Sequence, residues 1–469
     1  MRLPALGVTT ALAALAVGFA SVGSGADATA VRPIVRFLDL GGGPVRGGPS
    51  GLGAPITIYG TGFGDKRGRV TIGGHEVARY LLWGGHAANV RLQTIVVQPG
   101  PNVGGGSVVV TAGGRSSRGK ARFKATHGRI FTVAPAGSDS ALCTEREPCA
   151  TLSHVIHDRM RGGDVMLVRG GVYAESEIWI RGSAGERGTA ARPLSIKAYP
   201  LERPVFENAD RPLIVDSDNV TIAGLEFHGG KSLGIPETGL PGHHGDRLID
   251  NVVKGTVGFA AFDVHGDGHL LAGNVCDVAG SSVGTQGHCY YVSYGDGDTL
   301  LNNVAQGATG YGIHVFDQQR STTDFRRRIS HLLIDGNVMR RSRLRSGLIL
   351  AMGDEGSLGN QINAVTVRNN IFEANSHAGI VISSNVHDVT ITGNTFDQNG
   401  REGVSIADDP TISQIRIAGN TITQSTNTTC TVECSGFPVA HVAIGKRARN
   451  VRVVRNHYGP GRANVVRTG

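Results

Sequence analysis

Four side chains that can exchange protons fall in three short apolar segments near the middle of the chain. Asp263 and His265 belong to AFDVH, Tyr291 to CYYVSY and His314 to GIHVFD. If these segments are strands, alternate residues face opposite sides, and the flanking apolar residues mark the buried side. The four then lie on one outward face, a set suited to general acid–base catalysis, in which one group takes a proton and another supplies one.

This placement requires Phe262 and Val264 to point inward. The matching outward positions of the later segments GLILAM, GIVISS and GVSIAD are unreactive: Ile349, Val381 and Ser405. A face that is only solvated would carry similar residues from end to end, so the uneven distribution marks the candidate catalytic site. The alternative is a structural role, which is common for a His or Tyr on a sheet.

Other polar residues near these segments could hold a substrate. The basic stretches QQRSTTDFRRR and MRRSRLR could bind carboxylates or sulfates through planar, two-pronged guanidinium groups, although such stretches can also be solvated loops. The candidate substrate-binding residues are Lys231, His244, His288, Asp317, Arg320 and Arg341.

Three acidic turns raise the question of a metal. Asp267, Asp296 and Asp298 could supply part of the six to eight oxygen ligands of calcium. Gly-Asp pairs are also ordinary turn residues, and the nonapeptide calcium repeat is absent from the sequence. Calcium is therefore a possible cofactor, and the metal ligands stay undetermined.

A repeated pattern must position these residues. Two or three apolar residues, a Gly or polar residue, an Asn and two more apolar residues recur between Asp246 and Asn456, with spacings of 23 to 36 residues. Such periods indicate a solenoid, and short Val/Ile/Leu segments broken by Gly, Asn and Asp are typical of strands. The repeated asparagines are Asn251, Asn274, Asn303, Asn337, Asn370, Asn394, Asn420 and Asn456.

A strand that returns to the same place after each lap makes a parallel coil of eight or nine rungs, in which stacked asparagines can bond one another. The second residue after each Asn is apolar and predicts the core. The third is polar and faces outward, and it places Lys254 beside Asp277 and Arg340 beside Glu373. Such pairs are typical of a solvated charge ladder, which weakens Lys254 as a candidate base.

The chain begins with a pattern typical of export. Arg2, the apolar run from Leu6 to Ala20 and small-residue cleavage sites near Ala28 predict a signal peptide over residues 1–30. No later stretch is long enough to cross a bilayer. We therefore expect a secreted, extracellular or cell-surface protein. The net charge of +8 favours acidic partners if it is locally concentrated.

Six cysteines in an exported chain predict disulfides before metal ligands. Cys143 and Cys149 are close enough to close a loop, as are Cys430 and Cys434. Cys276 and Cys289 remain, and Cys276 falls in the predicted core column. This last pair is either a disulfide or buried free thiols.

Residues 31–126 form a separate unit of short alternating strands with Gly turns, which predicts a small antiparallel β-sandwich. The segments GTGFG, VTIGG and VVVTAGGRSS resemble the immunoglobulin-like IPT/TIG module. The resemblance implies a spacing, binding or presenting role and no catalysis.

Residues 127–469 begin with the pattern VAPAGSDS…CATLSHVIHDRMRGGDVMLVRGGVY…RPLSIKAYP. This pattern resembles the entry into pectate-lyase-like right-handed parallel β-helix proteins. Near residues 151–160, Thr151 can cap a helix that buries Leu152, Val155, Ile156 and Met160. The resemblance implies an all-β solenoid whose first rung is covered by this helix, because an open end exposes apolar surface and an unpaired edge.

The resemblance also implies chemistry on an acidic polysaccharide. Such proteins include lyases and epimerases, in which a His or Tyr takes a proton beside a uronate carboxylate and another group supplies one. The segment FDVHGDGH is only distantly similar to the Asp-Pro-His-Asp motif of the epimerases, and no lysine base with an aspartate cluster is found. Hydrolysis needs paired carboxylates, and none is evident near Asp263.

The other function is a non-catalytic carbohydrate-binding or surface-attachment protein, because a fold does not carry a function. We expect an acidic polysaccharide as partner and a monomer, with no nucleic acid and no membrane insertion.

Overall fold

The structure is a computed structural model. The part that it describes comprises residues 31–118, 121–182, 187–207, 212–230, 233–235, 243–256, 258–278, 284–317, 328–352, 361–423 and 440–468. The expected signal peptide and the pair Cys430 and Cys434 lie outside this part. Within it, no helix is long and apolar enough to cross a membrane.

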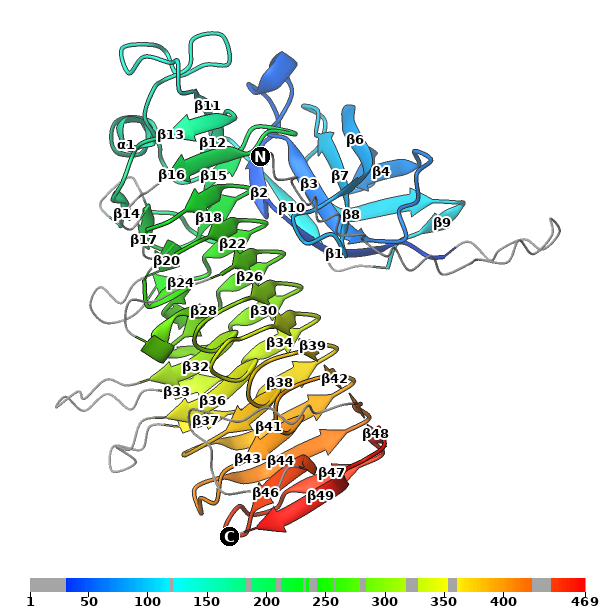
Figure 1. Ribbon diagram of the computed structural model, residues 1–469. Helices are drawn as coiled ribbons and strands as arrows, with labels where there is room; N and C mark the ends of the chain where they lie inside the picture. The colour runs from blue at the N-terminus through cyan, green and yellow to red at the C-terminus, as the bar shows by residue number, and fades with distance from the viewer. Residues whose placement is uncertain are drawn as a thin grey trace, which may run out of the picture.

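Most of the chain winds into a long parallel β-helix with three strands in each coil (Figure 1). The strands of each sheet are contributed by successive coils and pair in parallel. The first sheet has twelve strands: β11(Ile130–Val133), β12(Val165–Val168), β15(Leu194–Ala198), β18(Val220–Ala223), β22(Arg247–Ile249), β26(Leu270–Ala272), β30(Thr299–Leu301), β34(Leu333–Asp335), β38(Val365–Arg368), β41(His387–Thr392), β44(Ser413–Ala418) and β47(Arg452–Val454).

The other two long sheets have eleven strands each. The second sheet contains β13(Gly171–Tyr173), β16(Pro204–Glu207), β19(Glu226–His228), β23(Val252–Lys254), β27(Val275–Asp277), β31(Val304–Gln306), β35(Val338–Arg340), β39(Ile371–Glu373), β42(Thr395–Asp397), β45(Thr421–Ile422) and β48(His457–Tyr458). The third contains β14(Ile178–Arg181), β17(Leu213–Asp216), β20(Leu233–Ile235), β24(Ala260–Val264), β28(His288–Val292), β32(Ile313–Asp317), β36(Leu348–Met352), β40(Ile380–Ile382), β43(Val404–Ile406), β46(Ala440–Gly445) and β49(Ala463–Thr468).

The all-β parallel solenoid expected from the sequence is confirmed, and it is longer than the eight or nine rungs that the asparagines predict. The extra coils lie before Asn251, where the sequence lacks the repeated Asn. Short strands in the turns make two minor sheets: β21(His243–His244) with β25(Gly266–Asp267), and β29(Gly295–Asp296) with β33(Arg328–Ser330) and β37(Gln361–Asn363).

The interior of the coil is a single apolar core. The second-sheet column predicted from the asparagines is confirmed, because Cys276, Ala305, Met339, Phe372 and Phe396 follow one another in register. All five are buried. Cys276 is bonded to Cys289 in a disulfide, which settles the alternative that the sequence leaves open, and Cys143 is bonded to Cys149 as predicted.

The eight repeated asparagines form a continuous buried ladder. At each step the side-chain oxygen of one Asn accepts bonds from the backbone N–H and the side-chain amide of the Asn one coil earlier. Between Asn303 and Asn337 these distances are 2.8 and 2.9 Å. The Asn337 amide also donates to the Leu300 carbonyl at 2.8 Å. A second, shorter ladder joins Asn375 to Asn399, and the sequence pattern did not identify it.

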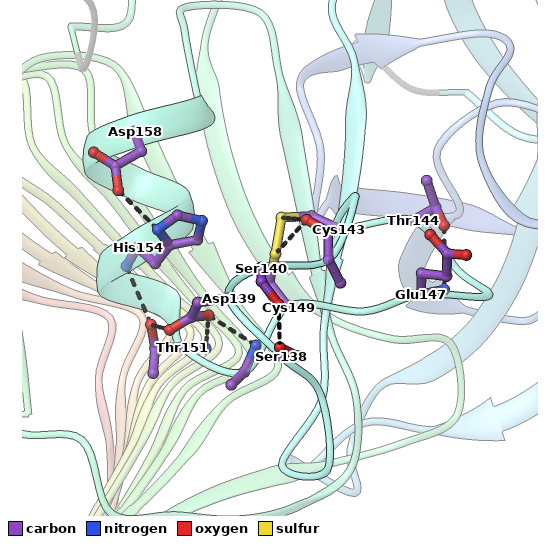
Figure 2. The surroundings of a disulfide bond; sticks show 12 residues. Ser138, Asp139, Ser140, Cys143, Thr144, Glu147, Cys149, Thr151, His154 and Asp158 are labelled. Carbon is purple, nitrogen blue, oxygen red and sulfur yellow. Dashed lines mark hydrogen bonds and ion pairs between the residues drawn. A yellow bond between two sulfur atoms is a disulfide. The ribbon is translucent and has the colours of Figure 1, made fainter.

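The helix expected at the entrance is present but short. It comprises α1(Leu152–His154) and one turn of π-helix, η2(Val155–Arg159). The Thr151 hydroxyl accepts the His154 N–H at 3.3 Å, and the Asp139 carboxylate holds the Thr151 hydroxyl and backbone (Figure 2). Leu152, Val155, Ile156 and Met160 are fully buried, so this segment closes the first coil as predicted.

The N-terminal unit is a sandwich of two small sheets. One sheet contains β1(Ile34–Leu38), β3(Ile56–Thr61), β7(Gln93–Gln98) and β6(Arg79–His86), all antiparallel. The other contains β2(Gly42–Pro44), β10(Arg122–Thr126), β8(Gly105–Ala112), β4(Arg69–Ile72), β5(His75–Glu76) and β9(Arg115–Ser116), with η1(Pro49–Gly51) outside it.

The sandwich packs on the outer face of the first long sheet, beside the N-terminal coils (Figure 1). Val165 and Leu167 point out of the coil and join the sandwich core. The interface also buries charge: the Lys197 ammonium bonds the Asp39 carboxylate, and it donates to the Pro55 carbonyl at 2.8 Å. Because apolar and polar contacts continue along several coils, the two units are fixed to one another.

The Asn ladder gives a first prediction. Replacing Asn337 by Ala removes the acceptor of two Asn303 donors inside the core, and unmet buried donors are costly. We expect Asn337→Ala to lower the free energy of unfolding by about 2–4 kcal/mol. The matched substitution Asn456→Ala, at the half-exposed end of the ladder, should cost clearly less. Urea titration followed by circular dichroism measures both. Equal costs would show that the ladder does not act as a buried, cooperative array.

The buried ion pair gives a second prediction. Lys197→Met alone leaves the Asp39 carboxylate buried without its cation, which should cost about 3–5 kcal/mol. In the double variant Lys197→Met/Asp39→Asn, the asparagine oxygen can still accept the Leu40 and Thr57 N–H groups that Asp39 accepts now. We expect the double variant to regain part of the stability. A double variant less stable than Lys197→Met would contradict this account.

Candidate functional site

The four candidate catalytic residues lie together on the outer face of the third sheet. Asp263 on β24 pairs in register with Tyr291 on β28, and Tyr291 pairs with His314 on β32. Phe262 and Val264, on either side of Asp263, are fully buried in the core. The predicted strand phase is therefore correct.

The uneven decoration of this face is also as predicted. The column continues from His314 to Ile349, Val381 and Ser405 in register. Proton-exchanging groups thus occupy three neighbouring coils, and apolar or hydroxyl side chains follow.

The Asp263 carboxylate and the His265 imidazole form a pair. His265 Nε2 lies 2.9 Å from Asp263 Oδ1, and the two side chains are 12 % and 30 % exposed. A carboxylate acceptor places the ring proton on Nε2 and strengthens the other nitrogen, Nδ1, as a proton acceptor. The pair therefore has the arrangement of an oriented general base.

His288 and His314 form a second, buried pair whose proton positions follow from the backbone. The Tyr311 N–H donates to His288 Nδ1 at 3.0 Å, so the proton of neutral His288 is on Nε2. This Nε2–H faces His314 Nδ1 at 3.0 Å. His314 Nδ1 is then the acceptor, and the proton of neutral His314 is on its Nε2. One backbone N–H thus fixes the tautomers of both rings.

Burial keeps both histidines neutral. Loss of hydration, and to a lesser extent the nearby Arg345 guanidinium, lower the pKa of His288 to about 3. The pKa of His314 is held well below its usual value, mainly by burial and then by His288 and Arg345. At neutral pH the pair can therefore act as hydrogen-bond donors and acceptors without carrying charge.

Aromatic rings enclose the four catalytic candidates. Tyr291 lies edge-on to His314, with ring centroids 5.2 Å apart, and 6.0 Å from the His265 ring. Phe259 packs edge-on against Tyr291 at 4.7 Å and is 40 % exposed. An exposed ring beside the reactive groups offers a flat apolar surface to a ligand.

Arg345 brings positive charge next to this cluster. Its guanidinium lies over the Tyr311 ring at 5.2 Å, donates to the Tyr311 hydroxyl at 3.0 Å, and donates to the Thr285 hydroxyl at 3.0 Å. Thr285 belongs to η3(Gly284–Gln286), in the turn before β28. The site therefore combines a cation, two neutral imidazoles, a phenol and a carboxylate–imidazole pair.

Comparison with known families decides the architecture. The family described as "Right handed beta helix region" matches residues 210–444, and the family described as "IPT/TIG domain" matches residues 43–125. The chain belongs to the right-handed β-helix family. It carries an IPT/TIG domain at its N-terminal side, and both assignments agree with the resemblances in the sequence. No curated protein matches the chain.

Several solved structures resemble this β-helix protein at low identity. The A-module of an Azotobacter vinelandii mannuronan C-5 epimerase is 13 % identical, with 65 % of this chain and 91 % of that chain covered and a TM-score of 0.41. A rhamnogalacturonan lyase is 14 % identical, with 69 % and 87 % covered and a TM-score of 0.44. A pectate lyase is 13 % identical, with 72 % and 79 % covered and a TM-score of 0.39. The fold assignment rests on strand register and the family match, not on these scores.

The predicted substrate-binding residues are only partly brought together. His288 lies in the β-helix protein's reactive cluster, as the bonding partner of His314. His244 lies on β21, 3.4 Å from the Asp267 carboxylate, and Arg341 is exposed in the turn after β35. Lys231, Arg320 and the side chain of Asp317 lie outside the described part.

In the described residues, the carboxylates of the acidic turns bond to neighbouring turns and do not gather around one point. The Asp298 carboxylate is buried and accepts the His269 N–H at 2.8 Å. Asp267 accepts the Asp296 N–H at 2.8 Å, and Asp296 lies 2.6 Å from His331. These contacts stabilise stacked turns.

Three or more His, Cys, Asp or Glu side chains in that part of the chain gather at one place. The only group of three or more potential ligands close enough for one ion is Cys143, Cys149 and His154, whose cysteines are already bonded to each other.

The charge ladder of the second sheet has the predicted register but different partners. Lys254 lies beside Asp277 and Arg340 beside Glu373. The Lys254 ammonium, however, bonds Glu226 at 2.7 Å, and Arg340 donates to Gln306 at 2.7 Å. Lys254 thus forms an ion pair on another face of the coil, which further weakens it as a candidate base.

Sequence reasoning missed Phe259 and Tyr311, and it identified Arg345 only as part of the basic stretch MRRSRLR and not as a neighbour of the cluster. All three lie in the turns before third-sheet strands, where no repeat fixes their position. The pattern GYGIHVFD offered one signal: Tyr311 lies three residues before His314.

The buried histidines predict a pH dependence of stability. Below the ordinary value of 6.5, the unfolded chain binds a proton at His288, whereas the folded chain does so only near pH 3. The contribution of neutral His288 to the free energy of unfolding is therefore complete above pH 6.5, and it is lost as the pH falls from 6.5 toward 3.

Between pH 6.5 and 5 this histidine should account for about 2 kcal/mol. We expect His288→Gln to reduce the loss of unfolding free energy on acidification by about that amount, measured by urea titration at both values. His75→Gln, at an exposed histidine of the sandwich, should not reduce it. An unchanged acid loss in His288→Gln would show that His288 titrates normally.

Proposed function

We propose that the protein is an exported enzyme that acts on an acidic polysaccharide by removing a proton beside a uronate carboxylate. The observation that supports this most directly is the convergence of Asp263–His265, Tyr291 and His288–His314 on adjacent coils. The sequence resemblance to β-helix lyases and epimerases implies the same class of reaction. The two disulfides fit an extracellular setting.

His265 is the proposed general base. Its Nε2–H is held by Asp263. Nδ1 is buried in this structure, so the surrounding side chains have to move before Nδ1 takes the proton from carbon 5 of the uronate. As the proton moves, the Asp263 carboxylate stabilises the imidazolium that forms. Neutral His314 cannot play this part in the tautomer that these hydrogen bonds require, because its Nδ1 already accepts a bond from His288.

His314 is instead the proposed hydrogen-bond donor to the substrate carboxylate. Negative charge builds up on that carboxylate when carbon 5 loses its proton, and a fixed donor in a dry site stabilises such charge. His288 holds the ring so that Nε2–H is the donor. Arg345 adds positive potential at the same place.

Tyr291 lies between the Asp263–His265 pair and the His288–His314 pair, and it is the proposed proton donor. If the phenol protonates the oxygen on carbon 4, the C4–O bond breaks, a C4=C5 double bond forms, and the polymer is cleaved. If it protonates carbon 5 from the opposite face, the sugar is epimerised and no bond of the chain is broken. The base ends protonated and the tyrosine deprotonated in both cases, and solvent restores them.

A non-catalytic carbohydrate-binding protein is the second candidate. The exposed Phe259 ring beside Tyr291 favours it, since such rings stack on the apolar faces of sugars. The two functions differ in a simple way: a binding protein holds the polymer and releases it unchanged.

The deciding experiment incubates the protein with alginate, pectate, chondroitin and heparin, with and without calcium. Cleavage appears as ultraviolet absorbance of unsaturated uronate ends, and epimerisation as incorporation of deuterium from heavy water at carbon 5. We expect one of these signals on at least one polymer. Binding without either signal on every polymer would favour the second candidate.

Variants then test the assigned roles. We expect His265→Gln and His314→Gln each to lower turnover by about 10²–10⁴-fold, because each removes one proton-transfer or donor group. His331→Gln is the matched control, because this histidine is 71 % exposed and contacts Asp296 in a turn. If His314→Gln lowers only the melting temperature while turnover per folded molecule persists, the role of His314 is structural.

A further inference from the structure

The last two coils carry a concentration of positive charge on a face other than that of the catalytic cluster. Arg416 on β44 and Arg452 on β47 occupy the same outward position of the first sheet and are neighbours in register. Strands in a sheet lie about 4.8 Å apart. Both side chains are exposed, and the residues that flank them, Ile417 and Val453, face the core.

The surrounding turn strengthens this charge. The segment KRARNVRVVRN, residues 446–456, has five basic residues and no acidic one. Arg449 lies opposite Ser413 in the adjacent coil. We define the arginine patch as six exposed basic residues of the first sheet and its adjoining turns in these two coils: Arg416, Lys446, Arg447, Arg449, Arg452 and Arg455.

Elsewhere in the same sheet, the outward arginine of β38 is neutralised. Arg368 on β38 bonds the Asp335 carboxylate of the preceding coil at 2.9 and 3.0 Å. Within the arginine patch, Arg447 is paired with Asp408 at 3.2 Å. Arg416, Arg449 and Arg452 form no ion pair within the described residues.

Like charges on adjacent strands destabilise the folded protein. An anionic partner would relieve this repulsion, and the relief would strengthen its binding. At the position of Arg416, the two preceding coils carry the uncharged residues Thr390 and Thr366. In this column the neighbouring arginines are therefore confined to the end of the rod.

We propose that the arginine patch is a second, non-catalytic binding site for an acidic polysaccharide. Guanidinium groups bind carboxylates and sulfates in a planar, two-pronged way. A chain with regularly spaced anions can bridge arginines that are repeated from coil to coil, which a single small anion cannot do. The anionic character of the ligand follows from the arginines, and the choice of a polysaccharide rests on the proposed function.

The location indicates what the site does. The catalytic cluster lies on the third sheet and the patch on the first, so a polymer segment held by the patch does not lie over the cluster. The sandwich covers the first-sheet face of the earlier coils, and its contacts extend to Asn302. The remaining face at the far end of the rod is where a long polymer can be tethered while another segment is processed.

The test compares two triple variants that remove the same charge. Arg416→Gln/Arg449→Gln/Arg452→Gln removes the centre of the patch, and Arg46→Gln/Arg115→Gln/Arg118→Gln removes three exposed arginines of the sandwich. Binding of fluorescent polygalacturonate and alginate is titrated at 50 and 200 mM salt. We expect the patch variant to bind at least 10-fold more weakly, with a shallower salt dependence. The control variant should change less than 2-fold, since exposed charges are screened over about 8 Å.

Folding is checked by the melting temperature, which should stay the same or rise in the patch variant because repulsion is relieved. The conservative triple Arg→Lys variant should retain most of the binding. Turnover of a short uronate oligosaccharide, which is too short to reach the patch, should be unchanged.

Equal weakening in both triple variants would reduce the effect to net charge and overturn the proposal. Absence of polymer binding to the unaltered protein would overturn it as well. Duplex DNA that binds as tightly as the polysaccharides and competes with them would refute the assignment to a polysaccharide. Loss of turnover on the short oligosaccharide in the patch variant would contradict a non-catalytic role of the patch. If the protein has no catalytic activity, the binding titration still tests the patch by itself.

Discussion

The structure depends on one constraint: each coil must return so that its backbone pairs in register with the coil before it. Strand pairing alone sets the spacing of the coils. Burial of the apolar residues restricts the register, because a shift by one residue would turn every core side chain outward. The buried Asn ladder reinforces the same register. A misplaced Asn would leave an amide and a carbonyl unpaired inside the core, whereas the observed register satisfies both at every step.

The same register creates chemistry from isolated residues. Asp263, Tyr291 and His314 are separated by more than twenty residues at each step, and coil stacking makes them neighbours. The surface then acquires properties that no single segment has. A backbone N–H from the turn before β32 orients His288, and His288 orients His314. The donor property of His314 is thus a consequence of the fold one coil away.

The three sheets are used differently along the rod. The first sheet is covered by the IPT/TIG domain over its early coils, through Val165, Leu167 and the buried Lys197. Its final coils carry exposed arginines. The third sheet carries the proton-exchanging groups over its middle coils and unreactive residues afterwards. A solenoid permits this division, because each coil contacts only its neighbours and can vary outward residues without disturbing the core.

Most of the fold could be read from the sequence. The spacing of eight asparagines, the alternation around each and the cap beginning at Thr151 are local patterns, and local patterns survive without knowledge of tertiary contacts. They determined the parallel coil, the inward columns and the outward position of the four reactive residues. They also predicted the disulfide of Cys143 with Cys149, because a short loop leaves little choice.

Only the tertiary structure decided which side chains contact one another and where the residues of the turns lie. The pairing of His288 with His314 and the ion pair of Lys254 with Glu226 rather than Asp277 join different coils. The disulfide of Cys276 with Cys289 joins two strands of one coil across a turn. The turns vary in length, so the sequence does not state where Arg345 or Phe259 will lie. The reason is physical: an apolar period fixes the phase of a strand, but a side chain selects its partner by distance and burial, which exist only once the coils are stacked.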